Sequence, residues 1–334
     1  MTARERFLTV FSGQTPEDRL PMLEWAWWWD KTHHRWQDEG LPLHLDGDTM
    51  FEHFGLDYMP CIKAGGMTHG CPKRPAYHGA PIIHNEKEYE EILPYILNDE
   101  IIANCVDMAR ALKERHDKGE LIARVWLDGF FWFPRTLFGI ENHLCAFYDE
   151  PELMHRMNNG LAVFHIRAMD AIFDILTPDM VGFAEDMSYN HGPMISHDMF
   201  NEFIAPYYKR VLPYIKERGV KALVDSDGDV RQLIPWFIAL GMDGIYPLER
   251  QAGVDIVALR DKYPNLLMMG AYDKMVMSKG EAAMRVEFER LLPVMRSGRF
   301  LPSVDHQTPP EVSLENYQIY LRLFREYCSK AVRI

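Results

Sequence analysis

The sequence is short of cysteine, of basic charge and of long apolar runs. Its five cysteines are odd in number and widely spaced, which argues against a disulfide framework and favours a reducing compartment. Lys and Arg total 36 against 49 Asp and Glu, so the net charge of −13 leaves no basic surplus for a nucleic-acid backbone. A run of about 18 apolar residues, the length of a membrane span, is absent, and the charged start MTARERFLTVF does not resemble a signal peptide. We therefore expect a cytoplasmic protein that binds neither nucleic acid nor a membrane.

The chain also lacks the G-x-G-x-x-G turn of dinucleotide-binding folds. Instead, short apolar runs alternate with amphipathic stretches over most of its length. Each run is too short for a helix and rich in Val, Ile, Leu or Phe, which is typical of strands buried on both faces. The six clear runs are residues 121–127, 180–186, 220–225, 243–248, 265–270 and 299–305.

The stretches between the runs carry helix signals. Pro151 suits the first turn of a helix, and Ser278 with Glu281 predicts a capping box. Ser313 is placed to cap a final helix. Strands that alternate with helices in this way form a parallel sheet with helices outside it.

Two weaker runs complete the expected architecture. Residues 20–25 supply a seventh strand and residues 54–62 an eighth. We therefore predict an α/β fold of the (β/α)8 TIM-barrel class, with residues 1–334 as one domain. Residues 26–120 are rich in loop-forming sequence, with one helix near 99–116, and are expected to form an extended N-terminal cap over the barrel mouth.

Acidic side chains follow almost every expected strand, at the ends where parallel barrels place their active sites. Carboxylates gathered there repel one another, so a metal ion, a cationic substrate, or Arg135 and Arg250 should lie among them. The alternative is that several are helix caps or surface loop residues. The candidates are Glu24, Asp128, Glu185, Asp186, Asp225, Asp227, Glu249, Asp273 and Asp305, the last followed by His306.

Within this set the segment Asp225-Ser-Asp227-Gly228 is distinctive. In an extended chain, alternation puts both carboxylates on one side, and the glycine permits a tight turn. Together with His306 after the last strand, the two aspartates make a candidate site for a divalent metal. Aspartate suits harder ions and histidine suits zinc or iron.

Four tryptophans lie at positions 25, 27, 28 and 29. They either line a pocket for a flat ligand or form a packed wall. On the first interpretation, Trp25 and Trp28 bind substrate together with acidic and basic residues at the barrel mouth. The remaining candidate substrate-binding residues are Glu24, Asp128, Arg135, Arg250 and Asp273.

A competing cluster has the residue types of a zinc site. It contains His69, Cys71 and His78, with Cys61 nearby. The segment has no repeated C-x-x-C unit and is typical of a loop.

A series of motifs resembles the uroporphyrinogen decarboxylase superfamily, in particular the branch of methylcobalamin:coenzyme M methyltransferases and related corrinoid-dependent methyltransferases. The resemblance covers most of the chain and implies a (β/α)8 barrel. Its motifs are Gly192-Pro-Met-Ile-Ser196 through Phe203, Pro206 and Tyr207-Tyr-Lys-Arg210, then Asp225-Ser-Asp-Gly228, Gly241-Met-Asp-Gly-Ile245 and Leu314-Glu-Asn316.

In methyltransferases of this branch, a His-x-Cys-Gly motif and a second Cys hold zinc and activate a thiol. The matching positions here are Asp225, Asp227, Gly228 and His306. The positions keep possible ligands but no thiolate. This departure argues against coenzyme M as the acceptor and leaves the metal open between zinc and a harder ion.

The decarboxylases of the superfamily carry an Arg-Gln-Ala-Gly-Arg motif after the first strand, and its arginines bind substrate carboxylates. Here that strand runs into Glu24-Trp-Ala-Trp27, and residues 54–62 offer no match to the aspartate that the decarboxylases carry at the end of the second strand. His306 does match a decarboxylase histidine. The missing arginines argue against uroporphyrinogen as substrate.

The leading hypothesis is a metal-dependent methyltransferase that acts between a small methylated substrate and a corrinoid on a partner protein. Asp225, Asp227 and His306 would hold the metal, and Glu185, Glu249 or His306 would act in catalysis. The alternatives are a decarboxylase or lyase of a small acid, and a non-catalytic barrel that binds a corrinoid or a partner. A homodimer stays open.

Overall fold

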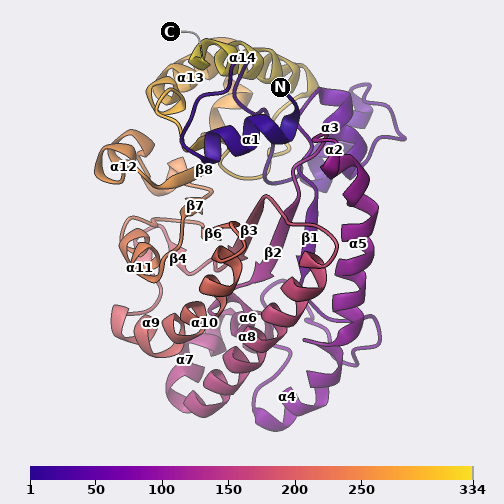
Figure 1. Cartoon of the computed structure of the whole chain (residues 1–334), viewed down its shortest axis with the longest axis vertical. Helices are drawn as coiled ribbons and strands as arrows, with labels where there is room; N and C mark the ends of the chain where they lie inside the picture. The colour runs from indigo at the N-terminus through magenta and orange to yellow at the C-terminus, as the bar shows by residue number, and fades with distance from the viewer. Residues whose placement is uncertain (333–334) are drawn as a thin grey trace.

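In the computed structural model, which describes residues 1–332, a seven-stranded parallel sheet is covered by helices (Figure 1). A separate antiparallel ribbon pairs β4 (Ser188–Tyr189) with β5 (Gly192–Pro193). These elements confirm the expected α/β class. In spatial order the large sheet contains β1 (Cys61–Ala64), β2 (Arg124–Asp128), β3 (Met180–Ala184), β6 (Lys221–Asp225), β7 (Gly244–Tyr246), β8 (Leu267–Tyr272) and β9 (Phe300–Val304).

Each of the six apolar runs overlaps one strand of this sheet, and the remaining strand is β1. The weak run 54–62 overlaps β1 only at its end, because Phe54 still belongs to a helix. The expected strand at residues 20–25 does not form a regular strand of the sheet.

Residues 20–25 lie between the two edges of the sheet. On one side, the N–H of Trp25 donates to Ser303 Oγ of β9 at 3.4 Å. On the other side, the Met22 carbonyl accepts from the N–H of Asp57, shortly before β1. The segment therefore occupies the place of an eighth strand, although its main-chain bonds are too irregular for a ladder.

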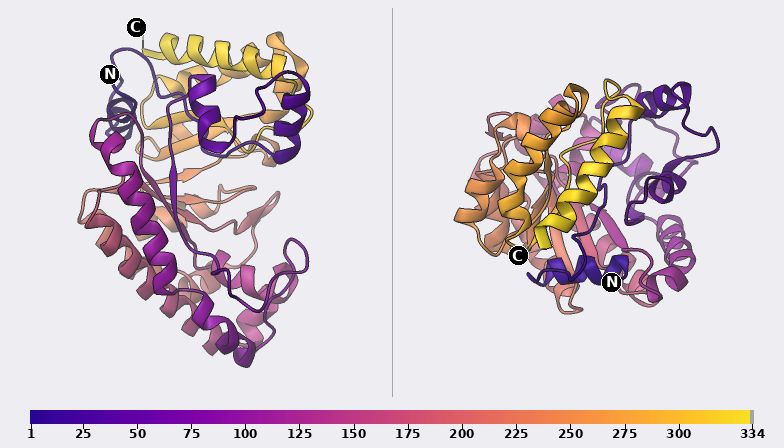
Figure 2. Two further views of the ribbon diagram at one scale, coloured as in Figure 1. Left: turned by 90° about the vertical axis from the view of Figure 1, so that its right-hand side faces the viewer. Right: turned by 90° about the horizontal axis from the view of Figure 1, so that it is seen from above.

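Helices form the outer layer, and α5 packs against both β1 and α8. Both chain ends lie at the same end of the molecule (Figures 1 and 2). None of the helices in the described part of the chain has the length and apolar character needed to span a bilayer. The helices are α1 (Ala3–Phe11), α2 (Asp30–Asp38), α3 (Gly47–Phe54), α4 (Glu86–Ile92), α5 (Asp99–Asp117), α6 (Trp132–Phe138), α7 (Ile140–Asp149), α8 (Pro151–Phe173), α9 (His197–Phe203), α10 (Ala205–Lys216), α11 (Leu233–Leu240), α12 (Ile256–Lys262), α13 (Glu281–Met295) and α14 (Leu314–Val332), with the 3-10 turns η1 (Leu93–Tyr95), η2 (Arg250–Ala252) and η3 (Lys274–Lys279).

Two of the predicted helix starts are confirmed. Pro151 opens α8, and Ser313 Oγ accepts the N–H of Asn316 at the start of α14. The capping box at Ser278 is wrong: this residue lies in η3, and Gly280, with φ of 83°, precedes α13 instead.

The segment expected to cap the mouth, residues 26–120, contributes to several parts of the molecule. It contains α2, α3 and α4, but also strand β1 and the long helix α5. Its share of the sheet brings two side chains, Cys61 and Lys63, to the cavity described below.

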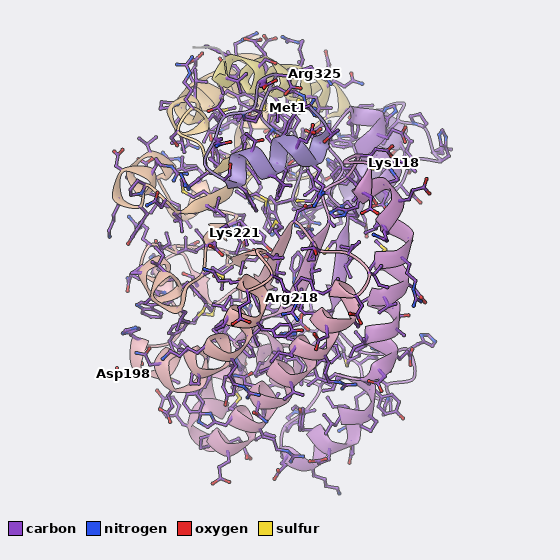
Figure 3. All side chains as sticks on the ribbon, viewed as in Figure 1. Met1, Lys118, Asp198, Arg218, Lys221 and Arg325 are labelled. Atoms are coloured by element: carbon purple, nitrogen blue, oxygen red, sulfur yellow. The ribbon has the colours of Figure 1, made fainter. Side chains whose placement is uncertain are left out.

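The strands place their side chains by simple alternation. In β2, Val125 and Leu127 are fully buried in the apolar core, while Arg124 and Trp126 line an internal cavity. Side chains fill the space between sheet and helices (Figure 3). Polar residues at alternate positions of otherwise apolar strands therefore mark the side that faces the cavity.

The carboxylate of Asp179, just before β3, connects α1, α5 and the residue that precedes β2. Its carboxylate accepts Arg4 Nε at 2.7 Å and the Ala123 N–H at 2.8 Å, and it lies 3.1 Å from His116 Nε2. Its side chain is 1% exposed, so loss of the carboxylate would leave buried partners unpaired. We expect Asp179→Ala to lower the free energy of unfolding by about 3 kcal/mol, as measured by urea denaturation.

The matched control for this variant is Asp107→Ala. Asp107 forms an exposed i,i+3 pair with Arg110, and such pairs contribute little to stability. Equal unfolding midpoints for the two variants would contradict the structural role of Asp179.

Candidate active site

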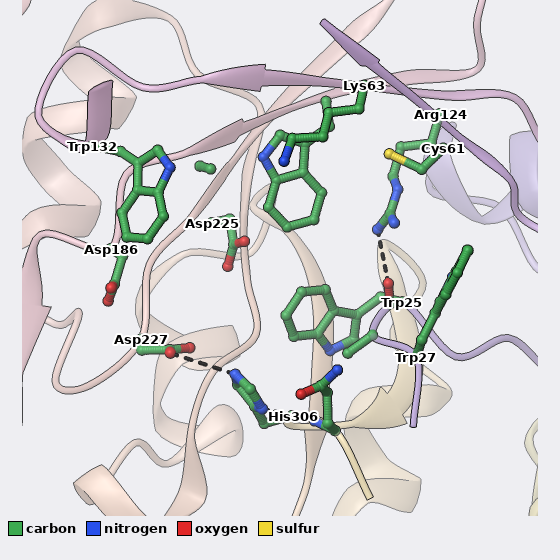
Figure 4. Close-up of a pocket in the computed structure, with 14 residues that line it drawn as sticks. Trp25, Trp27, Cys61, Lys63, Arg124, Trp132, Asp186, Asp225, Asp227 and His306 are labelled. Atoms are coloured by element: carbon green, nitrogen blue, oxygen red, sulfur yellow. Dashed lines mark hydrogen bonds and ion pairs between the residues drawn. The ribbon is translucent and has the colours of Figure 1, made fainter. Parts of the chain in front are cut away.

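A cavity of about 510 Å³ opens where β1, β2, β3 and β6 meet the segment 25–27 and the loop after β9 (Figure 4). Its volume is typical of a small-molecule site. The lining residues are Trp25, Ala26, Trp27, Cys61, Lys63, Arg124, Trp126, Trp132, Ala184, Asp186, Asp225, Asp227, His306 and Gln307.

The turn after β6 aims two carboxylates at this cavity. Asp225 ends the strand, and Asp227 follows two residues later. Gly228 has φ of 77°, and a Cβ at this position would lie 2.7 Å from the backbone of Tyr189 in β4. The tight turn expected from the sequence therefore requires glycine for both its dihedral angle and its close packing.

Burial and mutual repulsion raise the pKa values of these acids. The pKa of Asp227 is raised to about 7, chiefly by burial and then by the charges of Glu249 and Asp186. The pKa of Asp225 lies well above its usual value, again chiefly because of burial and then because of Asp227 and Asp186. Among residues 1–332, no side chain or N–H donates a hydrogen bond to the Asp225 carboxylate. These carboxylates are therefore suited to meet a positive group.

His306 faces Asp227 across the cavity, with Nε2 3.6 Å from Oδ2 (Figure 4). Its Nδ1 accepts the N–H of Gln307 at 2.8 Å. In a neutral ring this bond places the proton on Nε2, the atom that faces Asp227. Burial and the nearby charge of Lys274 lower the pKa of His306, which favours the neutral form.

The three predicted metal ligands share one cavity, but their arrangement does not fit a metal ion. No group of three or more His, Cys, Asp or Glu side chains in residues 1–332 is placed to hold one. In addition, Nε2 of His306 carries the proton in the arrangement described above, whereas a ligand nitrogen needs its lone pair. A metal at Asp225, Asp227 and His306 stays a prediction from the sequence.

The competing cysteine–histidine cluster is dispersed. Cys61 lines the main cavity, whereas Cys71 is buried and its Sγ donates to the carbonyl of Lys73. His69 and His78 are exposed on the loop. These positions offer no shared site.

Glu185, predicted to be catalytic, holds the turn after β2. Its carboxylate accepts the N–H groups of Phe130, Phe131 and Trp132 and the hydroxyl of Tyr208. It is fully buried, and burial raises its pKa to about 7 despite these four donors. The structure places it outside the cavity lining, where it orients Trp132.

Glu24 has a similar position on the other side of the barrel. It accepts the hydroxyls of Ser303 and Tyr320 and the N–H of Val304, and burial raises its pKa to about 7. These contacts fix the segment 20–25 to β9. They bring the next residue, Trp25, into the cavity wall.

Two of the predicted residues, Arg135 and Glu249, contact the residues that form the acidic end of the cavity. Arg135 pairs with Asp186 at 2.7 Å and also donates to its carbonyl, which steadies a residue with φ of 40°. Glu249 accepts the Gly228 N–H and lies 3.2 Å from Lys274 Nζ. Both act on the cavity through neighbours, and the cavity lining contains neither.

The remaining predicted residues have local structural partners. Asp273 caps η3 by accepting the N–H of Met275, and the Arg250 N–H donates to buried Asp305. Asp128 is buried beside the turn after β1. Trp28 packs into an aromatic cluster and does not line the cavity. That cluster contains Trp36, Phe51, Phe54 and Tyr317.

Sequence reasoning missed the basic side of the cavity. Arg124 lies opposite the aspartates, Lys63 reaches into the space between, and Trp126 and Trp132 extend the indole wall (Figure 4). Arg124 is the first residue of its strand, far from the strand end at which a parallel barrel places its active site. The available signal was the alternation of Arg124 and Trp126 with apolar neighbours in LIARVWL.

Comparisons with known proteins give one family and one fold. By sequence, no curated protein matches significantly. A methyltransferase from Methanosarcina mazei superposes with a TM-score of 0.63 at 13% identity, over 98% of this chain and 99% of that one. A protein assigned as a vitamin-B12 independent methionine synthase, from Listeria monocytogenes, gives 0.50 at 12% identity over 94% and 98%. The family model for uroporphyrinogen decarboxylase (URO-D) matches residues 60–327, which is most of the sequence, and the chain therefore belongs to the URO-D family.

Proposed function

We propose that this chain is a methyltransferase that moves a methyl group between a small methylated substrate and a corrinoid on a separate protein. The fold it shares with a methyltransferase supports the class of reaction. The observation that carries the proposal is the acidic end of the cavity, where Asp225 and Asp227 lie beside an indole wall.

Methyl transfer to a metal nucleophile requires a good leaving group on the substrate. A corrinoid at the cavity mouth would supply the nucleophile, a cobalt(I) centre. When the methyl group departs, its bonding electron pair stays on nitrogen or oxygen. That atom leaves well only if it already carries positive charge or receives a proton.

The protein's own residues can provide for that charge. Ionised Asp225 and Asp227 can bind and orient a substrate whose leaving atom is already cationic, and protonated Asp227 can donate a proton to a neutral leaving atom. The Nε2–H of His306 points toward Asp227 and favours its ionised form. No step in this scheme passes through a metal ion.

One observation favours a second function. Lys63 and Arg124 make the cavity suitable for a substrate carboxylate, as a decarboxylase or lyase of a small acid would need. Arg135 and Arg250, first suggested for this task, do not line the cavity. Release of carbon dioxide without methyl transfer would select this alternative, and ligand binding without turnover would select a non-catalytic barrel.

The central prediction concerns Asp227. With a corrinoid protein, a reductant and a panel of methylated amines and methyl ethers, we expect methylation of the cobalt. The change in corrinoid absorption measures it. Asp227→Ala should lower the rate at least about 100-fold, because the substrate loses the carboxyl group that orients a cationic leaving atom or protonates a neutral one. His306→Ala should also lower it, and Asp107→Ala serves as the control.

The melting temperatures of these variants should match that of the parent protein, since the side chains of Asp227 and His306 do not belong to the hydrophobic core. If no substrate yields methyl–cobalt absorption with the cognate corrinoid protein, the methyltransferase proposal is refuted.

A second prediction follows from the pKa of Asp227, which is about 7. Burial, Glu249, Asp186 and Asp305 raise this value, whereas Lys274 lowers it. Above pH 7 the carboxylate is ionised and can pair with a cation. For a permanently charged methylammonium substrate, kcat/KM should therefore rise as pH increases through about 7 and then level off. In Asp227→Asn this rise should be absent.

A profile that falls through the same range would contradict this assignment. It would mean that the protonated acid is the active form and that the leaving atom is neutral.

A third prediction concerns metal. Because the donor atoms do not converge, we expect turnover to persist after dialysis against a chelator, with metal content measured by mass spectrometry. Stoichiometric zinc that disappears in Asp227→Ala or His306→Ala would show instead that the site rearranges around an ion.

A further inference from the structure

The cavity contains a buried cation that the protein does not neutralise. Arg124 is 2% exposed, and its Nη1 donates to the carbonyl of Trp25 at 3.0 Å. Its Nε has no hydrogen-bond partner. A buried charge without a counterion is costly, so this guanidinium is suited to an anionic ligand group.

The nearby acids do not fill that role. Asp186 pairs with Arg135, and Asp227 faces His306. Asp225 is near enough for the charge of Arg124 to lower its pKa, but the two form no ion pair within 4.0 Å. Within residues 1–332, neither Arg124 nor Lys63 has an acidic oxygen within 4.0 Å. Lys63 is exposed toward the cavity on the neighbouring strand, in register with Trp126. Two cations from adjacent strands thus form one end of the cavity.

The opposite end has the reverse charge. In Figure 4, Asp186, Asp225 and Asp227 lie across from Arg124, and the Lys63 side chain reaches into the space between Asp225 and Arg124. A ligand that carried only negative charge would be repelled here, and one that carried only positive charge would leave Arg124 unpaired. The two ends together select a molecule with both charges.

Indole rings line the space between the two ends. Trp25, Trp27, Trp126 and Trp132 all contribute to the wall. Tryptophan faces bind quaternary ammonium groups well, because the methyl groups spread the charge and make it weakly hydrated. A simple amino acid ammonium would instead need several directed hydrogen bonds.

We infer that the substrate is a small zwitterion, with an N-methylated ammonium group against the aspartates and tryptophans and a carboxylate on Arg124 and Lys63. The inference names the substrate class for the proposed methyl transfer, and its chemistry rests on that proposal. In the reaction the N–CH3 bond breaks and its electron pair stays on nitrogen. The nucleophile, a cobalt(I) corrinoid, supplies the pair for the new bond to carbon. The amine product is neutral at nitrogen, so no proton donor is required.

Binding to the full-length protein tests the charge pattern without any corrinoid. The probe is trimethylammonioacetate, with longer trimethylammonio carboxylates to find the best span, measured by calorimetry and tryptophan fluorescence. Two controls each remove one charge: 3,3-dimethylbutanoate replaces nitrogen by carbon, and choline lacks the carboxylate. We expect the best zwitterion to bind at least about tenfold more tightly than either control.

Substitutions at the two ends of the cavity test which ligand group binds at each end. Lys63→Met should weaken zwitterion binding about tenfold and leave choline unchanged, because Lys63 meets only the carboxylate. Asp225→Asn should weaken both cationic ligands and leave 3,3-dimethylbutanoate unchanged. Lys87→Met, an exposed lysine on α4, is the matched control. Arg124→Lys tests the buried position while keeping its charge, and Lys63→Met remains informative if that variant does not fold.

The outcomes separate this inference from the proposed function. If no zwitterion in the series binds better than its single-charge controls, the substrate class is wrong, even if methyl ethers are demethylated. If zwitterions bind with the predicted variant pattern but no methyl group reaches cobalt, the ligand class stands and the methyltransferase proposal fails.

Discussion

The parallel register of β1, β2, β3 and β6 determines which side chains meet in the cavity. Lys63 pairs with Trp126, Trp126 with Gly182, and Ala184 with Asp225. Because side chains alternate along each strand, the positions in step on adjacent strands face the same side. A slip of one residue in β2 would replace its charged and aromatic side chains by Val125 and Leu127 and would remove the basic end of the site.

The buried carboxylates differ in the hydrogen-bond donors that they contact, and this difference distinguishes structural acids from the acid proposed to act on the substrate. Glu24 and Glu185 each accept hydroxyl and backbone N–H donors that fix a turn or an edge of the barrel. Asp227 has a comparable pKa, near 7, but faces only the histidine ring and the cavity. A raised pKa alone therefore does not identify a reacting group in this protein, and the lack of internal donors is the reason for proposing that Asp227 takes part in the reaction.

The sequence was informative about features that depend on the pattern of neighbouring residues, such as strands and the side on which a side chain lies. The six apolar runs each overlap a strand, and the spacing of Asp225 and Asp227 correctly suggested a shared orientation, with His306 in the same cavity. The partners of Glu185 could not be predicted, because its donors come from residues 130–132 and from Tyr208, which only the folded chain brings together. The basic end was not predicted, because Arg124 lies at the start of its strand, whereas the active-site residues of a parallel barrel are expected at strand ends.

The unneutralised charge of Arg124 also links ligand recognition to the thermodynamics of folding. A side chain that is 2% exposed and lacks a counterion subtracts from the stability of the free protein. A small ligand whose carboxylate pairs with it in the folded state, and not in the unfolded chain, would raise the melting temperature with its concentration. The same guanidinium that gives the cavity its polarity thus links the melting temperature of this enzyme to the concentration of the ligand that occupies the cavity.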